Sequence, residues 1–127
     1  QFYSTFTSNQ SWNHSTMYVD LKETMKVEEL HVLYEQFYAN EQFVRVLPLG
    51  KTADLKYIKY SNYCDVSIHL DERSNRAIIV SAIDNMVKGA AGQAIQNMNI
   101  LFDLDEGMGL KMVAHPSRKG MGNYESI

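Results

Sequence analysis

The sequence predicts an α+β domain, with a mainly antiparallel sheet and helices on one face. Several short segments alternate apolar and polar residues, which is the pattern of half-buried strands. One longer segment spaces its apolar residues as a helix does, and another follows a helix-capping turn. The order is strand, helix, four strands and helix, and 127 residues are enough for one such domain.

The first strand and the first helix are predicted from their periodicity. Residues 15–21 alternate and place Met17, Val19 and Leu21 on one face. Residues 27–38 carry an apolar stripe at helical spacing, and two glutamates lie in the first turn, where the helix dipole favours carboxylates. The stripe consists of Val27, Leu30, Leu33, Tyr34, Phe37 and Tyr38.

Two short extended pieces are expected after this helix. Residues 43–47 form a short strand that Pro48 helps to end, because proline has no N–H to donate to a sheet. Residues 50–54 read as a loop, and residues 56–60 as a second extended piece. These pieces add short strands to the predicted sheet.

A hairpin is predicted from the clearest alternation in the chain. Residues 63–70 alternate, residues 71–75 form a polar turn, and residues 77–83 are apolar on both faces, like a central strand. One face of the first strand carries Cys64, Val66, Ile68 and Leu70, and the other carries Tyr63, Asp65, Ser67 and His69.

Residues 80–102, VSAIDNMVKGAAGQAIQNMNILF, run from a buried strand through an Asp-Asn turn into a helix that begins with small residues. Each glycine inside a helix costs about 1 kcal/mol relative to alanine. Two glycines within four positions, Gly89 and Gly92, therefore predict that an element or a ligand approaches this backbone closely.

This stretch resembles the C-terminal signature of the N-acetyl-gamma-glutamyl-phosphate reductases. SNYCDVSIHLDERSNRAIIVSAIDN (residues 61–85) and YEQFYANEQFVRVLP (residues 34–48) also resemble that family, in the same order. The resemblance implies a glyceraldehyde-3-phosphate-dehydrogenase-like C-terminal domain. It divides the chain into a non-matching segment 1–14, a substrate and dimerisation domain 15–106, and a flexible tail 107–127.

The resemblance also implies a reaction, the NADPH-dependent reduction of N-acetyl-gamma-glutamyl phosphate to the semialdehyde in arginine biosynthesis. In that family a cysteine attacks the acyl phosphate, phosphate leaves, and hydride reduces the thioester. The Gly-Cys-Tyr-Pro motif that holds this cysteine is absent here, and no Gly-x-Gly-x-x-Gly motif follows a strand. We therefore expect the C-terminal part of an NADP-dependent oxidoreductase, with no catalytic residue and no activity by itself.

The strongest candidate site is the Asp84-Asn85 turn with the helix start behind it. The simplest interpretation is a capped helix, since Asp and Asn are favoured N-caps. A helix start with free N–H groups and little side-chain bulk also suits an anion or a carboxamide. The resemblance places this start beside the nicotinamide, which makes Asn85, Lys88, Gly89 and Ala90 the predicted NADP contacts of the complete enzyme.

The other reactive side chains favour structural interpretations. Cys64 lies on an apolar strand face with no evident histidine partner, and burial makes a thiol inert. No metal site is predicted, because His14, His31, His69 and His115 do not have ligand spacing. The polar strand face that holds His69 is expected to be solvated or to form a subunit interface, and the resemblance favours the interface.

Four basic residues and two helix ends complete the expectations. Lys51, Lys56, Lys59 and Arg45 are expected on the solvated surface, some of them near the substrate phosphate. Asp103 stands where the family usually has the glycine that ends a helix in the left-handed conformation, so a poorer helix end is expected. Lys26 stands where a threonine commonly caps the helix, so a weaker start is expected there.

Composition limits the partners. A net charge of -3 and a pI near 5.8 argue against nucleic acid or an anionic membrane. One cysteine suits a reducing compartment, so a cytoplasmic location is expected. The expected partners are a second copy in a dimer or tetramer, the missing cofactor domain and a small acyl phosphate. An aspartate-semialdehyde dehydrogenase relative and a catalytically silent oligomerisation module remain alternatives.

Overall fold

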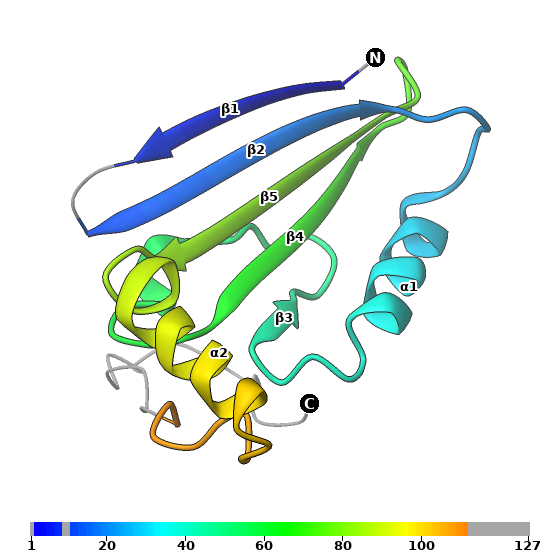
Figure 1. Ribbon diagram of the computed structural model, residues 1–127. Coiled ribbons are helices and arrows are strands. Elements are labelled where there is room, and N and C mark those ends of the chain that lie inside the picture. The colour runs from blue at the N-terminus through cyan, green and yellow to red at the C-terminus, as the bar shows by residue number, and fades with distance from the viewer. Residues whose placement is uncertain (1, 9–10, 112–127) are drawn as a thin grey trace.

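The computed structural model describes residues 2–8 and 11–111, and these form one five-stranded sheet (Figure 1). The strands lie in the order β1-β2-β5-β4-β3. All neighbours are antiparallel except β3 and β4, which are parallel. The strands are β1 (Phe2–Ser8), β2 (Trp12–Asp20), β3 (Val44–Val46), β4 (Cys64–Asp71) and β5 (Arg76–Asp84). The predicted α+β class with a mainly antiparallel sheet is confirmed.

One face of the sheet packs against α1 (Val27–Phe37). The register places Met17 opposite Ile79, and Ile79 opposite Ile68, so apolar side chains align across the three long strands. Leu30 of α1 is buried against this row. The predicted apolar stripe therefore supplies one core of the domain, whose buried members are Leu30, Val66, Ile68, Ala77 and Ile79.

The start of α1 is weaker than an ordinary capped start, as expected. Lys26 occupies the N-cap position, and its side chain makes no capping hydrogen bond. The backbone N–H of Lys26 donates to Glu29 Oε2 at 2.9 Å. Only the glutamate half of a capping box is therefore present, because an ammonium group cannot accept a hydrogen bond.

The opposite face is covered by the segment between β3 and β4. Leu47, Ala53 and Ile58 pack there on Val80 and Ala82 of β5. The expectation of an extended piece over residues 56–60 is wrong, because this segment contains a 3-10 helix, η1 (Leu55–Tyr57). The carboxylate of Asp54 accepts a hydrogen bond from the backbone N–H of Lys56 at 2.9 Å, which caps this turn.

The strand β1 was not expected. Residues 2–8 pair along their whole length with β2, which itself begins at Trp12 rather than at residue 15. The described side chains of β1, residues 3–7, are all exposed. The two strands form an edge ribbon, so residues 2–8 and 12–14 of the segment 1–14 belong to the sheet.

The chain leaves β5 through a π-helical turn, η2 (Val87–Ala91), and continues as α2 (Gly92–Leu101). Figure 1 shows α2 beyond the arrowhead of β5, away from α1. Asp103 adopts the left-handed conformation, with φ of 54°. Its N–H donates to Ile100 O, and the N–H of Leu104 donates to Asn99 O, which together complete a Schellman motif.

Residues after α2 fold back onto it. Asn99 is buried and donates through Nδ2 to the carbonyl oxygens of Glu106 and Met108, both at 3.0 Å. Gly107 and Leu110 are buried, so the first residues of the predicted flexible tail pack on the domain instead. Residues 112–127, with His115, lie outside the described residues. Within the described part of the chain, no helix is long and apolar enough to cross a membrane.

Candidate functional site

Asp84 fixes the turn that leads into η2. It is 4% exposed, and its Oδ1 accepts hydrogen bonds from the backbone N–H groups of Met86 at 2.9 Å and Val87 at 3.1 Å. Its Oδ2 accepts from the N–H of Tyr60 at 2.8 Å. The predicted capping role at this turn therefore belongs to Asp84, which also holds the loop before β4.

Asn85, a predicted cofactor contact, is tied to the start of β2. Its side-chain Oδ1 accepts from Asn13 Nδ2 at 2.8 Å, and its backbone N–H donates to Ser11 O at 3.0 Å. Among the described residues, no hydrogen bond uses its Nδ2 group. The half-buried amide is thus held in place with its donor side available.

The two glycines of the helix start have different surroundings. A Cβ at Gly89 would lie 2.5 Å from Asn85 Oδ1, the end of a side chain, and both Gly89 and Ala90 are exposed. A Cβ at Gly92 would collide with Asn62 Oδ1 and would lie 2.8 Å from the backbone oxygen of Val87. The predicted close approach is confirmed at buried Gly92, where the loop before β4 packs against the helix.

Lys88 is half-buried between Gln96 of α2 and the ring of Phe43. Its Nζ donates to Gln96 Oε1 at 2.7 Å and lies 5.4 Å from the centre of the Phe43 ring. Burial lowers the pKa of Lys88, while the nearby Cys64 and Glu106 oppose that shift. A partly desolvated ammonium group therefore stands beside the exposed turn.

Gln96 was not predicted as a site residue, and it is the centre of a buried polar network. Gln96 Oε1 accepts from Lys88 Nζ and from Asn62 Nδ2 at 2.9 Å, and its Nε2 donates to Glu106 Oε1 at 2.5 Å. Gly92, Gln96 and Asn99 recur at helical spacing and are the buried residues of α2. Small and polar residues at this helical spacing are the pattern by which the sequence indicated a polar buried face of α2.

The polar face of β4 is covered by this same chain, which corrects the expectation of a solvated face or subunit interface. Asp65 is 1% exposed and Ser67 is fully buried. The Ser67 hydroxyl accepts from the N–H of Ala53 at 3.1 Å and donates to Val80 O at 3.4 Å. At the exposed end of the strand, His69 Nε2 lies 3.4 Å from the Thr52 hydroxyl.

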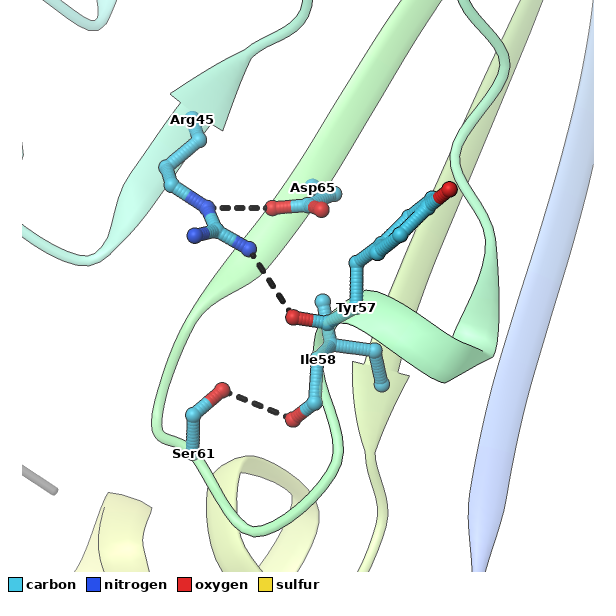
Figure 2. Close-up of polar contacts among 5 residues, drawn as sticks. All are labelled: Arg45, Tyr57, Ile58, Ser61 and Asp65. Atoms are coloured by element: carbon cyan, nitrogen blue, oxygen red, sulfur yellow. Dashed lines mark hydrogen bonds and ion pairs between the residues drawn. The ribbon is translucent and has the colours of Figure 1, made fainter. Parts of the chain in front are cut away.

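Arg45 was expected on the solvated surface but is a structural residue (Figure 2). Its Nε donates to Asp65 Oδ1 at 2.6 Å, and its guanidinium lies 4.5 Å from the centre of the Tyr63 ring. A longer bond of 3.4 Å joins it to the carbonyl oxygen of Tyr57. Figure 2 shows Arg45 linking β3, β4 and η1 in this way.

The remaining basic residues lie near the segment 48–60. Lys56 is exposed and pairs with Asp54 at 3.2 Å, and Lys51 is also exposed. Lys59 stands 4.8 Å from the centre of the Trp12 ring. Within the described residues, Lys56 and Lys59 thus have contacts of their own, with an aspartate and with an aromatic ring.

Cys64 is a poor nucleophile in this structure. It packs with the core beneath α1, and burial together with the neighbouring Asp65 raises the pKa of its thiol. Lys88 and Arg45 oppose that shift only in part. A thiol with a raised pKa holds little reactive thiolate, which agrees with the structural interpretation of this residue.

A family model described as "Semialdehyde dehydrogenase, dimerisation domain" matches residues 2–85. The chain belongs to this family. The match includes the edge strand β1 and ends at Asn85, so the described sheet and α1 are the family domain, while η2 and α2 follow it.

The chain is similar to curated relatives named N-acetyl-gamma-glutamyl-phosphate reductase. The relative from Brachyspira hyodysenteriae is 57% identical over 100 residues, which cover 78% of this chain and 28% of that protein. A relative from Clostridium beijerinckii is 51% identical over 100 residues, 79% of this chain and 29% of the relative. This semialdehyde dehydrogenase dimerisation domain thus spans less than a third of the length of these relatives.

Solved structures with the same fold include aspartate-semialdehyde dehydrogenases. That of aspartate semialdehyde dehydrogenase II from Vibrio cholerae has a TM-score of 0.58 and 16% identity, and the match covers 73% of this chain and 28% of that one. A probable aspartate-semialdehyde dehydrogenase from Pseudomonas aeruginosa gives a TM-score of 0.58 with 12% identity. At such identities the likeness establishes the fold alone.

Proposed function

We propose that this chain is the C-terminal substrate and dimerisation part of an NADPH-dependent N-acetyl-gamma-glutamyl-phosphate reductase. The observation that carries the proposal is the 57% identity over 100 residues to a reductase of that name. The aspartate-semialdehyde dehydrogenase alternative has far less support, because those solved structures are 12–18% identical to this chain. A cytoplasmic location is part of the same proposal.

The residues of the helix start fit a nicotinamide cofactor by their donor groups. Asn85 presents an amide whose oxygen is already bound by Asn13, which leaves its N–H groups for a carbonyl acceptor. Lys88 adds a positive charge, and the exposed Gly89 and Ala90 leave room beside the turn. When bound, NADPH would supply the hydride. These residues of the chain would bind the cofactor and orient its nicotinamide.

In the proposed reductase, the nucleophilic cysteine belongs to a part of the enzyme outside this chain. The only cysteine, Cys64, is held beneath α1 with a raised thiol pKa. The isolated chain is therefore expected to consume no NADPH in the presence of an acyl phosphate. A catalytically silent oligomerisation module would give the same result. What separates the two functions is activity when the chain is joined to a cofactor domain.

The partner of the dimerisation domain is proposed to be a second copy bound through the β1–β2 ribbon. All described side chains of β1 are exposed, and every residue of β2 is only partly buried. Large apolar side chains lie on both faces of β1, since Tyr3 is 52% exposed and Phe6 is 64% exposed. A ribbon left open in this way is a suitable surface for a symmetric pair.

A chimera tests the function directly. This chain would replace the segment of the Brachyspira hyodysenteriae reductase that it matches at 57% identity. We expect NADPH-dependent reduction of N-acetyl-gamma-glutamyl phosphate, and a rise in the KM for NADPH of about tenfold in Lys88→Met, for the loss of one charged contact. A folded chimera without reductase activity would contradict the proposal, and an unchanged KM in Lys88→Met would remove Lys88 from the cofactor site.

A further inference from the structure

The Lys88 ammonium group contacts one residue of the following helix and one residue far away in sequence. Its Nζ donates to Gln96 Oε1 at 2.7 Å and stands 5.4 Å from the centre of the Phe43 ring. Lys88 lies within η2, next to the exposed Gly89. A lysine side chain has four rotatable bonds, so an ammonium group that serves a ligand needs something to hold it.

The amide of Gln96 can take only one orientation. An ammonium group can only donate and an ionised carboxylate can only accept, so the Gln96 oxygen must face Lys88 and its nitrogen must face Glu106. Asn62 Nδ2 donates to the same oxygen at 2.9 Å. Gln96 is 8% exposed, and these bonds occupy its oxygen and its nitrogen from opposite sides.

Glu106 is in turn fixed by the segment that follows α2. The buried Asn99 holds the backbone oxygen of Glu106 at 3.0 Å, and the N–H of Gly107 donates to Asp105 Oδ1 at 2.8 Å. Glu106 and Lys88 are therefore connected by two hydrogen bonds of one neutral amide, that of Gln96. The order Glu106–Gln96–Lys88 forms a relay from the C-terminal turn to the exposed start of the helix.

We propose that Gln96 is the positioning residue for Lys88, and that the Glu106–Gln96 relay holds the ammonium group where the cofactor binds. This inference rests on the proposed function, because it takes Lys88 as a cofactor contact. Loss of the relay should release Lys88 and weaken NADPH binding without removing any group that touches the cofactor. Exchange of the side chains at positions 96 and 106, Gln96→Glu with Glu106→Gln, should preserve the position of Lys88 and the affinity for NADPH.

The first test follows Lys88 in the 127-residue chain, without cofactor. The Cε proton resonances of Lys88 should be displaced by the Phe43 ring current. We expect Gln96→Leu to move them to the values of a solvated lysine, and Gln93→Leu to leave them unchanged. Gln93 is a matched control, because it bonds Asn97 at 2.9 Å on the exposed side of the same helix. Unchanged Lys88 resonances in folded Gln96→Leu would overturn the inference.

The second test uses the relay exchange. Gln96→Glu alone keeps an acceptor for Lys88 but replaces the donor that faces Glu106 with a second carboxylate oxygen, 2.5 Å from Glu106 Oε1. Repulsion between the two carboxylates should turn the substituted side chain and shift Lys88, which is bonded to it, away from the Phe43 ring. Adding Glu106→Gln removes the repulsion and restores an amide donor opposite that carboxylate, while Lys88 keeps its acceptor, so the double variant should restore the displaced resonances. Failure of the double variant to restore them, while it remains folded, would also overturn the relay.

The third test measures the NADPH dissociation constant of the chimera. We expect it to rise about tenfold in Gln96→Leu, as in Lys88→Met, and to return toward the unsubstituted value in the double variant. The two proposals fail differently. Resonances that move while NADPH affinity stays constant would contradict the role of Lys88 in cofactor binding, whereas resonances that stay fixed would contradict the role of Gln96.

Discussion

Asp65 is a buried carboxylate with a single charged partner among the described residues. Its side chain is 2% exposed, while that of Arg45 is 36% exposed. Burial raises the pKa of Asp65, although Arg45 acts in the opposite direction. The folded chain therefore binds this proton more tightly than the unfolded chain does, and that difference makes stability depend on pH.

The sign follows from the raised pKa. The contribution of Asp65 to the free energy of unfolding is greatest below its unfolded pKa, about 3.9, and is lost as the pH rises through the higher folded value. Asp65→Asn should remove this component, which urea unfolding at a series of pH values would measure. An unchanged pH dependence in Asp65→Asn would contradict the assignment.

Removal of Arg45 should be costly at neutral pH, because it leaves the Asp65 carboxylate buried without a charged partner. Breaking a fully buried pair costs about 3–5 kcal/mol, and the partial exposure of Arg45 reduces our expectation for Arg45→Met to about 2 kcal/mol. Arg76→Met is the matched control. Its pair with Asp20 is partly exposed on both sides, so its loss should destabilise the chain less than the loss of Arg45 does.

Asp103 occupies a conformation that favours glycine. Its φ of 54° lies in the left-handed region, where an L-residue with a Cβ is disfavoured by about 1–2 kcal/mol, somewhat less for Asp. Asp103→Gly should therefore stabilise the chain by about 1 kcal/mol in urea unfolding. Asp103→Asn separates the effect of charge near a helix C-terminus from that of conformation, and an equal gain in both variants would show that charge is responsible.

At the scale of elements, substitution by alanine should affect the stability of the chain differently at the two glycines of the helix start. Gly92→Ala brings a Cβ against Asn62 and the backbone oxygen of Val87, and overpacking costs about 1–3 kcal/mol. Gly89→Ala meets only the end of the Asn85 side chain, and the gain of about 1 kcal/mol in helix propensity offsets the loss of the Asn13–Asn85 bond.

Thermal or urea unfolding of the two alanine variants measures this difference. We expect Gly92→Ala to be clearly destabilised and Gly89→Ala to remain within about 0.5 kcal/mol of the original chain. Equal losses would mean that Asn85 is as rigidly placed as the loop at Asn62.

The elements with strong periodicity were predicted from sequence, whereas the short helix η1 and the edge strand β1 were not. Residues 63–70 alternate and residues 77–83 are largely apolar, and these two segments correspond closely to β4 and β5. The 3-10 helix η1 was missed because a helix of three residues is too short to show a periodic pattern. β1 was missed although FYSTFTS is rich in aromatic residues and threonine, both of which favour strands.

The candidate site shows the same limit. The Asp-Asn turn and the small residues were visible in the sequence, because capping and helix propensity are local properties. The bond between Asn85 and Asn13 spans 72 positions and depends on the register of β2 with β5. The burial of Asp65 and its pairing with Arg45 likewise depend on the parallel pairing of β3 and β4.

For the whole molecule, we expect self-association through the β1–β2 ribbon. Phe6→Glu and Tyr3→Glu place a charge on opposite faces of β1, because neighbouring side chains alternate along a strand and these two are three positions apart. At least one of them should raise the dissociation constant of the dimer tenfold or more, measured by sedimentation. Glu28→Gln on the exposed start of α1 is the control. A monomeric chain, or a dimer unaffected by both variants, would contradict this interface.

α2 is joined to the rest of the chain mainly by polar bonds, so it should open locally more readily than the sheet. It contacts η2 extensively and the strands little, and its buried residues are Gly92, Gln96 and Asn99. Segments with few buried apolar contacts open at lower free energy than a central sheet. Amide hydrogens of α2 should therefore exchange with solvent sooner than those of β4 and β5. A partner that covers the exposed Leu101 and Phe102 should slow that exchange, so the exchange rate of α2 would show whether this surface is covered.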